Sequence, residues 1–257
     1  MADEYILETQ GLTKEFKGFV AVNNVDLKVQ RGHIHALIGP NGAGKTTFFN
    51  LLTKFLPPTR GAIRYRGVDI TQEKPAQIAR RGIVRSFQIS AVFPHMTVLE
   101  NVRAALQRNL GTSFHFWKPE TSLHPLHERA RQLLADVDLQ DFADELTVNL
   151  PYGRKRALEL ATTMALEPDL MLLDEPTQGM GHEDVGRVTQ LIKKVSIGRT
   201  ILMVEHNMNV VSSIADRITV LQRGVVIADG PYAEVSKNPL VIEAYMGSAD
   251  TELQGAH

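Results

Sequence analysis

One stretch of this sequence limits its fold and chemistry more than any other: a glycine, four further residues, and then Gly-Lys-Thr. The stretch consists of Gly39, Pro40, Asn41, Gly42, Ala43, Gly44, Lys45, Thr46 and Thr47. This spacing is typical of a phosphate-binding loop, because glycines let successive backbone N–H groups point at phosphate oxygens. In such a loop Lys45 reaches the β- and γ-phosphates and the Thr46 hydroxyl binds Mg²⁺.

The residues on either side agree with this interpretation. Residues 33–38 predict a short strand that enters the loop, and residues 47–52 predict a helix that leaves it. The positive end of that helix dipole favours an anion. The alternative is a glycine-rich turn with an incidental Lys-Thr, which the strand and helix disfavour. The sequence therefore predicts a nucleotide site built on a strand, a loop and a helix.

Composition narrows the class of protein. The 257 residues include 43% hydrophobic residues, no cysteine, and 28 Lys and Arg against 29 Asp and Glu. The absence of cysteine excludes disulfides, iron–sulfur clusters and Cys-ligated zinc. The balanced charge does not favour nucleic acid as a partner. No apolar run approaches the roughly 18 residues of a membrane span, so any membrane role is expected to be peripheral, inside the cell.

The order of hydrophobic patterns predicts an α/β protein with one domain over 1–257. Short alternating stretches over residues 5–30 predict an antiparallel β layer. Residues 89–164 predict a mostly helical subdomain inserted between two parts of an α/β core, 1–88 and 165–257. Within the second part, residues 170–173 and 201–204 are continuous apolar runs, as expected for parallel strands covered on both faces.

Polar residues follow those two runs and point to catalysis. Asp174 and Glu175 end the first run and His206 follows the second. Ligands bind at the carboxyl ends of parallel strands, so these side chains are expected beside the phosphate loop. There Asp174 is a candidate Mg²⁺ ligand and Glu175 is placed to polarise an attacking water. The alternative is a helix-start pair ahead of Thr177.

His206 and Gln88 are weaker candidates for functional residues than the acidic pair. A lone histidine after a strand is more often structural, but next to the loop His206 can contact the γ-phosphate. Gln88 lies where the helical insert begins and is able to touch metal and water. On its own, the position of Gln88 favours neither a functional nor a structural role.

The loop, Gln88, the Leu-Leu-Asp-Glu-Pro run at 172–176 and His206 together resemble the ATP-binding-cassette ATPases over nearly the whole chain. Residues 20–25, 85–88 and 243–247 resemble the ATPase subunits of branched-chain amino-acid uptake systems. The resemblance implies a P-loop NTPase fold of the cassette type. Its core would be a RecA-like mixed sheet with an N-terminal antiparallel β layer and a helical subdomain.

The resemblance also implies roles and partners. ATP and Mg²⁺ would be the ligands, with Phe16 stacked on adenine and Val22 in the ATP-binding set. Gln88 would sense Mg²⁺ and the attacking water, Glu175 would act as catalytic base, and His206 would be the switch histidine. Two ATPase subunits would sandwich two ATP molecules, and a transmembrane permease would dock near the Gln88 loop. The chain would lie at the cytoplasmic face of the inner membrane and work indirectly with an extracytoplasmic solute-binding protein.

The sequence departs from the family pattern in the segment that meets ATP across the dimer. This signature segment consists of Leu150, Pro151, Tyr152, Gly153 and Arg154, where the family usually has Leu-Ser-Gly-Gly-Gln. Pro151 offers neither a hydroxyl nor an N–H, although proline suits the first turn of a helix. The cations at 154–156 oppose the helix dipole unless they face a triphosphate, and a solvated face is the alternative. Gly181 stands where the family commonly has an aspartate, so a heterodimer with unequal ATP sites is one hypothesis.

The expected function is an ATP-hydrolysing subunit of a membrane importer for branched-chain or related amino acids. Two alternatives remain open. One is a cassette ATPase of another transport system, for a different polar solute or for lipopolysaccharide export. The other is a soluble ATP-dependent switch protein, a class that generally has two cassettes or a long coiled-coil insertion, neither of which is present in this sequence.

Overall fold

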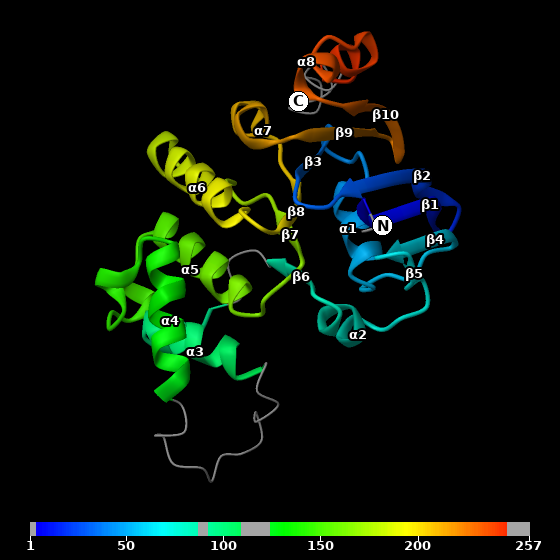
Figure 1. The fold of residues 1–257 in the computed structure, drawn as a ribbon. Coiled ribbons are helices and arrows are strands. Elements are labelled where there is room, and N and C mark those ends of the chain that lie inside the picture. Colours follow the sequence, from blue (N-terminus) through cyan, green and yellow to red (C-terminus); the bar gives the residue numbers. More distant parts are fainter. Residues whose placement is uncertain (1–3, 87–91, 109–123, 246–257) are drawn as a thin grey trace.

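A computed structural model describes residues 4–86, 92–108 and 124–245 of the chain and contains two sheets (Figure 1). The smaller sheet has four strands in the order β2-β1-β4-β5. Its strands are β1 (Tyr5–Phe16), β2 (Phe19–Gln30), β4 (Arg60–Tyr65) and β5 (Val68–Asp69). Each neighbouring pair is antiparallel, which confirms the predicted N-terminal β layer.

The larger sheet has six strands in the order β10-β9-β3-β8-β7-β6. Its strands are β3 (Ile34–Ile38), β6 (Ile83–Ser86), β7 (Leu170–Asp174), β8 (Thr200–Val204), β9 (Arg217–Gln222) and β10 (Val225–Gly230). All neighbours run parallel except the β9–β10 hairpin. That hairpin turns at Arg223 and Gly224, with φ angles of 47° and 81°. The mixed sheet agrees with the fold that the family resemblance implies.

The helices lie on both sides of this sheet and in a separate lobe, drawn in green at the left of Figure 1. The lobe contains α3 (Val98–Gln107), α4 (His124–Asp136) and α5 (Tyr152–Met164). The other helices are α1 (Lys45–Leu52), α2 (Pro75–Arg80), α6 (His182–Val195), α7 (Met208–Ile214) and α8 (Tyr232–Val235). Residues 239–245 are also helical. In the described ranges, none of the helices is both long and apolar enough to cross a membrane.

The start of α3 illustrates how local sequence sets an element. The Thr97 hydroxyl accepts a hydrogen bond from the Glu100 N–H at 3.2 Å, and the Glu100 carboxylate accepts one from the Thr97 N–H at 2.7 Å. This reciprocal pair is a capping box, which satisfies backbone donors at a helix N-terminus. This helix belongs to the mostly helical stretch predicted within residues 89–164.

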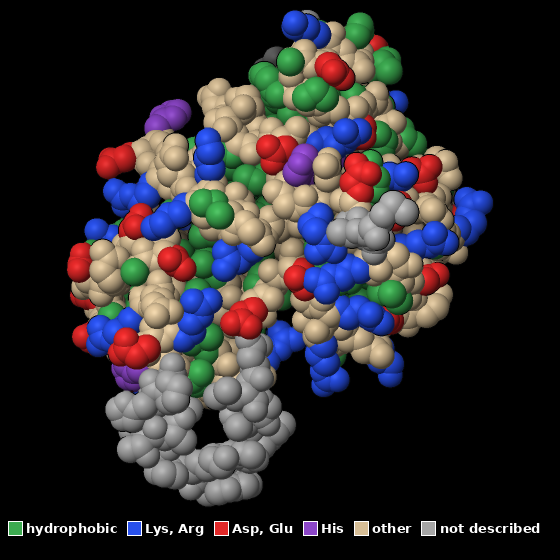
Figure 2. Space-filling model, viewed as in Figure 1, with side chains coloured by type: hydrophobic (Ala, Val, Ile, Leu, Met, Phe, Trp, Pro, Cys, Tyr) green, Lys and Arg blue, Asp and Glu red, His purple; other side chains and the backbone are tan. Residues whose placement is uncertain are grey.

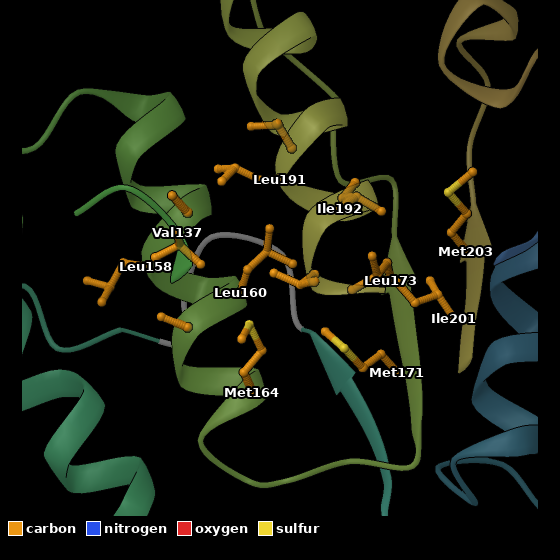
Figure 3. Close-up of a cluster of buried hydrophobic side chains, with 14 of the residues drawn as sticks. Val137, Leu158, Leu160, Met164, Met171, Leu173, Leu191, Ile192, Ile201 and Met203 are labelled. Carbon is orange, nitrogen blue, oxygen red and sulfur yellow. The ribbon is translucent and has the colours of Figure 1, made fainter. Parts of the chain in front are cut away.

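Alternate residues of the central strands point to opposite faces of the larger sheet and join two separate cores. Leu170 and Leu172 of β7 pack with α1 and the smaller sheet. Met171 and Leu173, the residues between and after them, pack with α5, α6 and α7. Figure 3 shows side chains of α5 and α6 directed at this face. A strand covered on both faces needs a continuous apolar run, which explains the sequence of β7.

Candidate active site

The phosphate loop connects the C-terminal end of β3 to α1 and depends on glycines. Gly39 and Gly44 have φ angles of 151° and 100°, which favour glycine. A Cβ on Gly39 would lie 2.1 Å from the Leu221 carbonyl oxygen, and one on Gly44 would lie 2.4 Å from the Ala21 carbonyl oxygen. Backbone therefore packs against backbone at these two points. The loop is held in a tight curl of the kind that leaves N–H groups free to meet phosphate.

Lys45, the first residue of α1, folds back over the loop. Its Nζ donates to the carbonyl oxygens of Gly39 at 2.6 Å and Pro40 at 3.0 Å, and the residue is only 8% exposed. Burial lowers the pKa of Lys45, and the carboxylates of Glu175 and Asp174 oppose that shift. The lysine, the loop and the two acidic residues therefore share one site. Such a site, with a curled backbone and a buried ammonium group, fits the phosphate chain of a nucleotide.

Asp174, the last residue of β7, is paired with an arginine. Arg85 Nη2 donates to Asp174 Oδ2, and Arg85 Nη1 donates to Asn50 Oδ1 at 2.6 Å. Both side chains of the ion pair are about one-tenth exposed, at 10% for Arg85 and 9% for Asp174. Since a buried carboxylate requires a partner, the Arg85 guanidinium compensates the Asp174 carboxylate and links β6, α1 and β7. Sequence reasoning did not assign this role to Arg85.

The donors near the loop suit magnesium. Among the described residues no cluster of three or more His, Cys, Asp and Glu side chains is placed to hold a metal. The loop instead offers the exposed Thr46 hydroxyl, with Thr47 beside it on α1, and the Asp174 carboxylate. Mg²⁺ is usually bound by one or two carboxylates together with substrate phosphates and water. The oxygen donors present therefore fit Mg²⁺ bound together with a nucleotide.

Glu175 lies in a turn with a conformation that is unusual for a non-glycine residue. Its φ angle is 47°, its N–H donates to the Val204 carbonyl at 2.9 Å, and its carbonyl accepts from the Gln178 N–H at 3.1 Å. The next helix, α6, begins only at His182, so the alternative of a helix-start pair ahead of Thr177 is wrong. A left-handed backbone held by the surrounding structure is common at functional sites.

Glu205 follows β8 and connects it to the turn after β7. It is fully buried, and its carboxylate accepts from the Thr177 N–H at 3.2 Å, the Thr177 hydroxyl, the His206 N–H at 2.7 Å and the Asn207 N–H at 2.9 Å. The charge is thus compensated by four donors. The His206 side chain is 55% exposed, with Nδ1 3.8 Å from Glu205 Oε2. Glu205 therefore fixes the backbone, and His206 is left accessible at the site.

The residues expected around the adenine differ in exposure. Phe16, at the end of β1, is 40% exposed, and Lys14 Nζ lies 5.0 Å from its ring centroid. Val22, which the resemblance places in the ATP-binding set, is fully buried in the core formed with α1 and the smaller sheet. Gln88 lies outside the described residues, two positions after the end of β6.

The signature segment forms the start of α5. Leu150 is buried, Pro151 is the exposed N-cap residue, and the Tyr152 hydroxyl donates to the Gln178 carbonyl oxygen at 3.1 Å. Gly153 is buried, and a Cβ there would lie 2.6 Å from Asp184 Oδ1. The segment is therefore packed against the turn that follows Glu175 and against the first turn of α6.

The three cations that follow Gly153 each have a partner within the chain. The Arg154 guanidinium lies 3.8 Å from the centroid of the Phe142 ring. Lys155 Nζ donates to the Val148 carbonyl at 3.0 Å, and Arg156 Nη1 donates to Glu159 Oε2 at 2.7 Å. The alternative of a solvated face is therefore wrong for Arg156, which is only 5% exposed.

The fold and this site define a P-loop ATPase of the cassette type. The family model described as ABC transporter matches residues 22–178, and the one described as branched-chain amino acid ATP-binding cassette transporter matches residues 225–251. The chain therefore belongs to the ABC transporter family and is an ABC ATPase domain. Its sequence places it beside the branched-chain amino-acid transport ATP-binding proteins within that family.

The similar proteins cover nearly the whole chain. The high-affinity branched-chain amino acid transport ATP-binding protein BraF of Pseudomonas aeruginosa is 41% identical over 95% of this chain and 98% of its own length. LivG of Escherichia coli, described in the same words, is 39% identical with the same coverage. The ADP conformation of the cassette MJ1267 superposes with a TM-score of 0.84 at 30% identity, covering 95% of this chain and 99% of that one. The dimeric bacterial cassette MJ0796 gives 0.72 at 25% identity, covering 88% and 98%.

Proposed function

We propose that this chain is the ATP-hydrolysing subunit of a membrane importer for branched-chain or related amino acids. The observation that carries the proposal is the arrangement of the phosphate loop and Lys45 at the end of β3 with Asp174 and Glu175 at the end of β7, one strand apart in the larger sheet. The identity to BraF and LivG over nearly the whole chain supports the choice of cargo. The chain would be peripheral, at the cytoplasmic face of the inner membrane.

The residues of the site have distinct roles in this proposal. Loop N–H groups and Lys45 bind and neutralise the phosphates, while Phe16 stacks on the adenine. Glu175 orients the attacking water and accepts its proton, and the exposed His206 contacts the γ-phosphate. Thr46, Asp174 and Gln88 would hold Mg²⁺, which neutralises charge on the phosphates when bound. The buried Arg85–Asp174 pair fixes the carboxylate in its position.

ATP would drive a change between open and closed dimers. A second ATPase subunit, identical or different, places its signature segment against the ATP held by this chain. Moving such an equilibrium from mostly open to mostly closed requires about 5.5 kcal/mol of differential binding. Two triphosphates, each with several charge-assisted contacts, are able to supply it. Hydrolysis then removes the bridge and the dimer reopens.

A groove between the core and the helical lobe is a suitable place for the permease. This docking groove is a cavity of about 570 Å³ whose lining includes Phe55, Ile78, Ser86, Phe93 and Glu159. Phe55 and Phe93 are 54% and 57% exposed although both are large and apolar. Over both lobes of the face drawn in Figure 2, acidic and basic side chains are interspersed. An apolar opening in such a surface favours a protein partner over solvent.

Uptake measured with the permease tests the cargo. The chain should co-purify from membranes with its permease subunits, and the complex in vesicles should import labelled leucine when ATP is supplied with an extracytoplasmic solute-binding protein. Glu175→Gln should abolish uptake and trap an ATP-bound dimer. A complex that hydrolyses ATP but imports no branched-chain amino acid would contradict the cargo alone, whereas failure to bind Mg-ATP would contradict the whole proposal.

A further inference from the structure

We infer that the Tyr152 hydroxyl positions the turn that carries Glu175 and ties this turn to a buried ion pair in the wall of the docking groove. The inference rests on the proposed role of Glu175 as catalytic base. Tyr152 belongs to the signature segment, yet its hydroxyl is used within its own chain. Tyr152 is thus a positioning residue that acts through the backbone of the Glu175 turn.

The first part of the connection is the ion pair on α5. Arg156 Nη1 donates to Glu159 Oε2 at 2.7 Å, and the residues are 5% and 4% exposed. Glu159 also lines the docking groove. Since two buried charges depend on each other for compensation, neither side chain is free to turn away. The guanidinium is therefore held in a fixed orientation one helical turn from Tyr152.

The second part fixes the direction of the Tyr152 hydroxyl. Arg156 Nη2 donates to the Tyr152 oxygen at 3.2 Å. Because a guanidinium only donates, the hydroxyl acts as acceptor there and keeps its own proton for another group. It donates that proton to the Gln178 carbonyl oxygen at 3.1 Å. The ion pair thus orients the hydroxyl toward the turn.

The third part is the turn itself. The N–H of Gln178 donates to the Glu175 carbonyl at 3.1 Å, so the residue that receives the Tyr152 proton also closes the turn of Glu175. Glu175 has a φ angle of 47°, a conformation that persists only when the surroundings maintain it. Loss of the Tyr152 contact would therefore let the turn relax and move the Glu175 carboxylate from its position.

The test is Tyr152→Phe, which removes only the hydroxyl, in the purified full chain with Mg-ATP. We expect kcat for ATP hydrolysis to fall about fivefold, the factor that one neutral hydrogen bond is worth, with KM and ATP affinity unchanged. Arg156→Lys, which keeps the charge but loses the fork that reaches Tyr152, should lower kcat in the same direction. Tyr232→Phe removes the same atom at a 37% exposed position on α8 and should have no effect.

A double variant separates positioning from a merely structural role. In the Glu175→Gln background, where the base is already absent, Tyr152→Phe should not lower the residual single-turnover rate further. A wild-type kcat in Tyr152→Phe, or an equal loss with and without Glu175, would overturn the inference. If Glu175→Gln alone kept the wild-type kcat, the proposed function of Glu175 would fail instead.

Discussion

The phosphate loop and the signature segment are both expected to meet ATP, yet different contacts hold them in place. Backbone contacts hold the loop, and side-chain contacts hold the signature segment. The loop is shaped by backbone, with Gly39 and Gly44 pressed against the carbonyls of Leu221 and Ala21. The signature segment is held by side chains, since Tyr152 contacts Gln178 and Arg154 stacks on Phe142. A site shaped by close backbone contacts tolerates few substitutions. A site held by side-chain contacts tolerates more of them, because other residues can make contacts with other partners.

Gly44→Ala should give the largest effect in this comparison. Its Cβ would lie 2.4 Å from the Ala21 carbonyl oxygen and its φ angle of 100° is unfavourable for alanine. The clash and the strained backbone together should lower the free energy of unfolding by about 4 kcal/mol and abolish ATP binding. Urea denaturation and fluorescence of a labelled nucleotide measure the two losses.

Gly42→Ala is the matched control for that prediction. Gly42 also has a positive φ angle, 75°, but a Cβ there has no neighbour within 4 Å. Only the backbone strain remains, which amounts to about 1 to 2 kcal/mol. Equal destabilisation by the two alanines would show that the close approach of backbone to backbone at Gly44 does not hold the loop.

Removing Arg85 should be the next largest change. Arg85→Ala leaves the Asp174 carboxylate without the guanidinium, and both side chains are about nine-tenths buried. Breaking such a pair should lower the free energy of unfolding by about 3 to 4 kcal/mol, measured by urea denaturation. The control is Arg66→Ala, because the Arg66–Asp169 pair is 41% and 42% exposed and should matter by less than about 1 kcal/mol.

The phosphate-loop site and the signature segment also show how much could be predicted from the sequence. The loop and the site shared by Asp174, Glu175 and Lys45 follow from local patterns and from the rule that ligands bind at the carboxyl ends of parallel strands. The Arg85–Asp174 pair joins residues 89 positions apart and exists only because β6 lies beside β7. No local pattern specifies that neighbour, and the same holds for the contact of Tyr152 with Gln178.

The strand that leads into the loop should give a measurable pH dependence. His35 is buried and its Nε2 lies 2.7 Å from Thr219 Oγ1; burial lowers the pKa of His35 to about 4, against the opposing charge of Asp229. Between pH 4 and 6.5 the unfolded chain binds a proton that the folded chain does not. The free energy of unfolding should therefore rise with pH across this range by up to about 3 kcal/mol.

Thermal or urea unfolding at several pH values checks this slope, and His35→Gln should flatten it. Glu159 on α5, the helix that begins with the signature segment, should contribute a slope of the opposite sign to the free energy of unfolding against pH. Burial raises the pKa of Glu159, even though Arg156 opposes that shift. A group of that kind contributes most at low pH, and its contribution declines as pH rises through its folded pKa. A slope that persists unchanged in His35→Gln would assign the pH dependence to other groups.

Substitutions of Gly181 should change the free energy of unfolding the least. This residue precedes α6, the helix against which the signature segment packs. It is the N-cap residue of α6 with an ordinary φ angle of −70°, it has no side-chain cap, and a Cβ there meets no atom within 4 Å. Gly181→Asp should stabilise the chain by a few tenths of a kcal/mol, since aspartate accepts from the first N–H groups of a helix. Gly181→Ala adds a Cβ without an acceptor and should be slightly destabilising. Both substitutions fit the space, so a loss of stability in Gly181→Asp would mean that the start of α6 does not tolerate the added charge. The region around the signature segment would then restrict its sequence as strongly as the phosphate loop does.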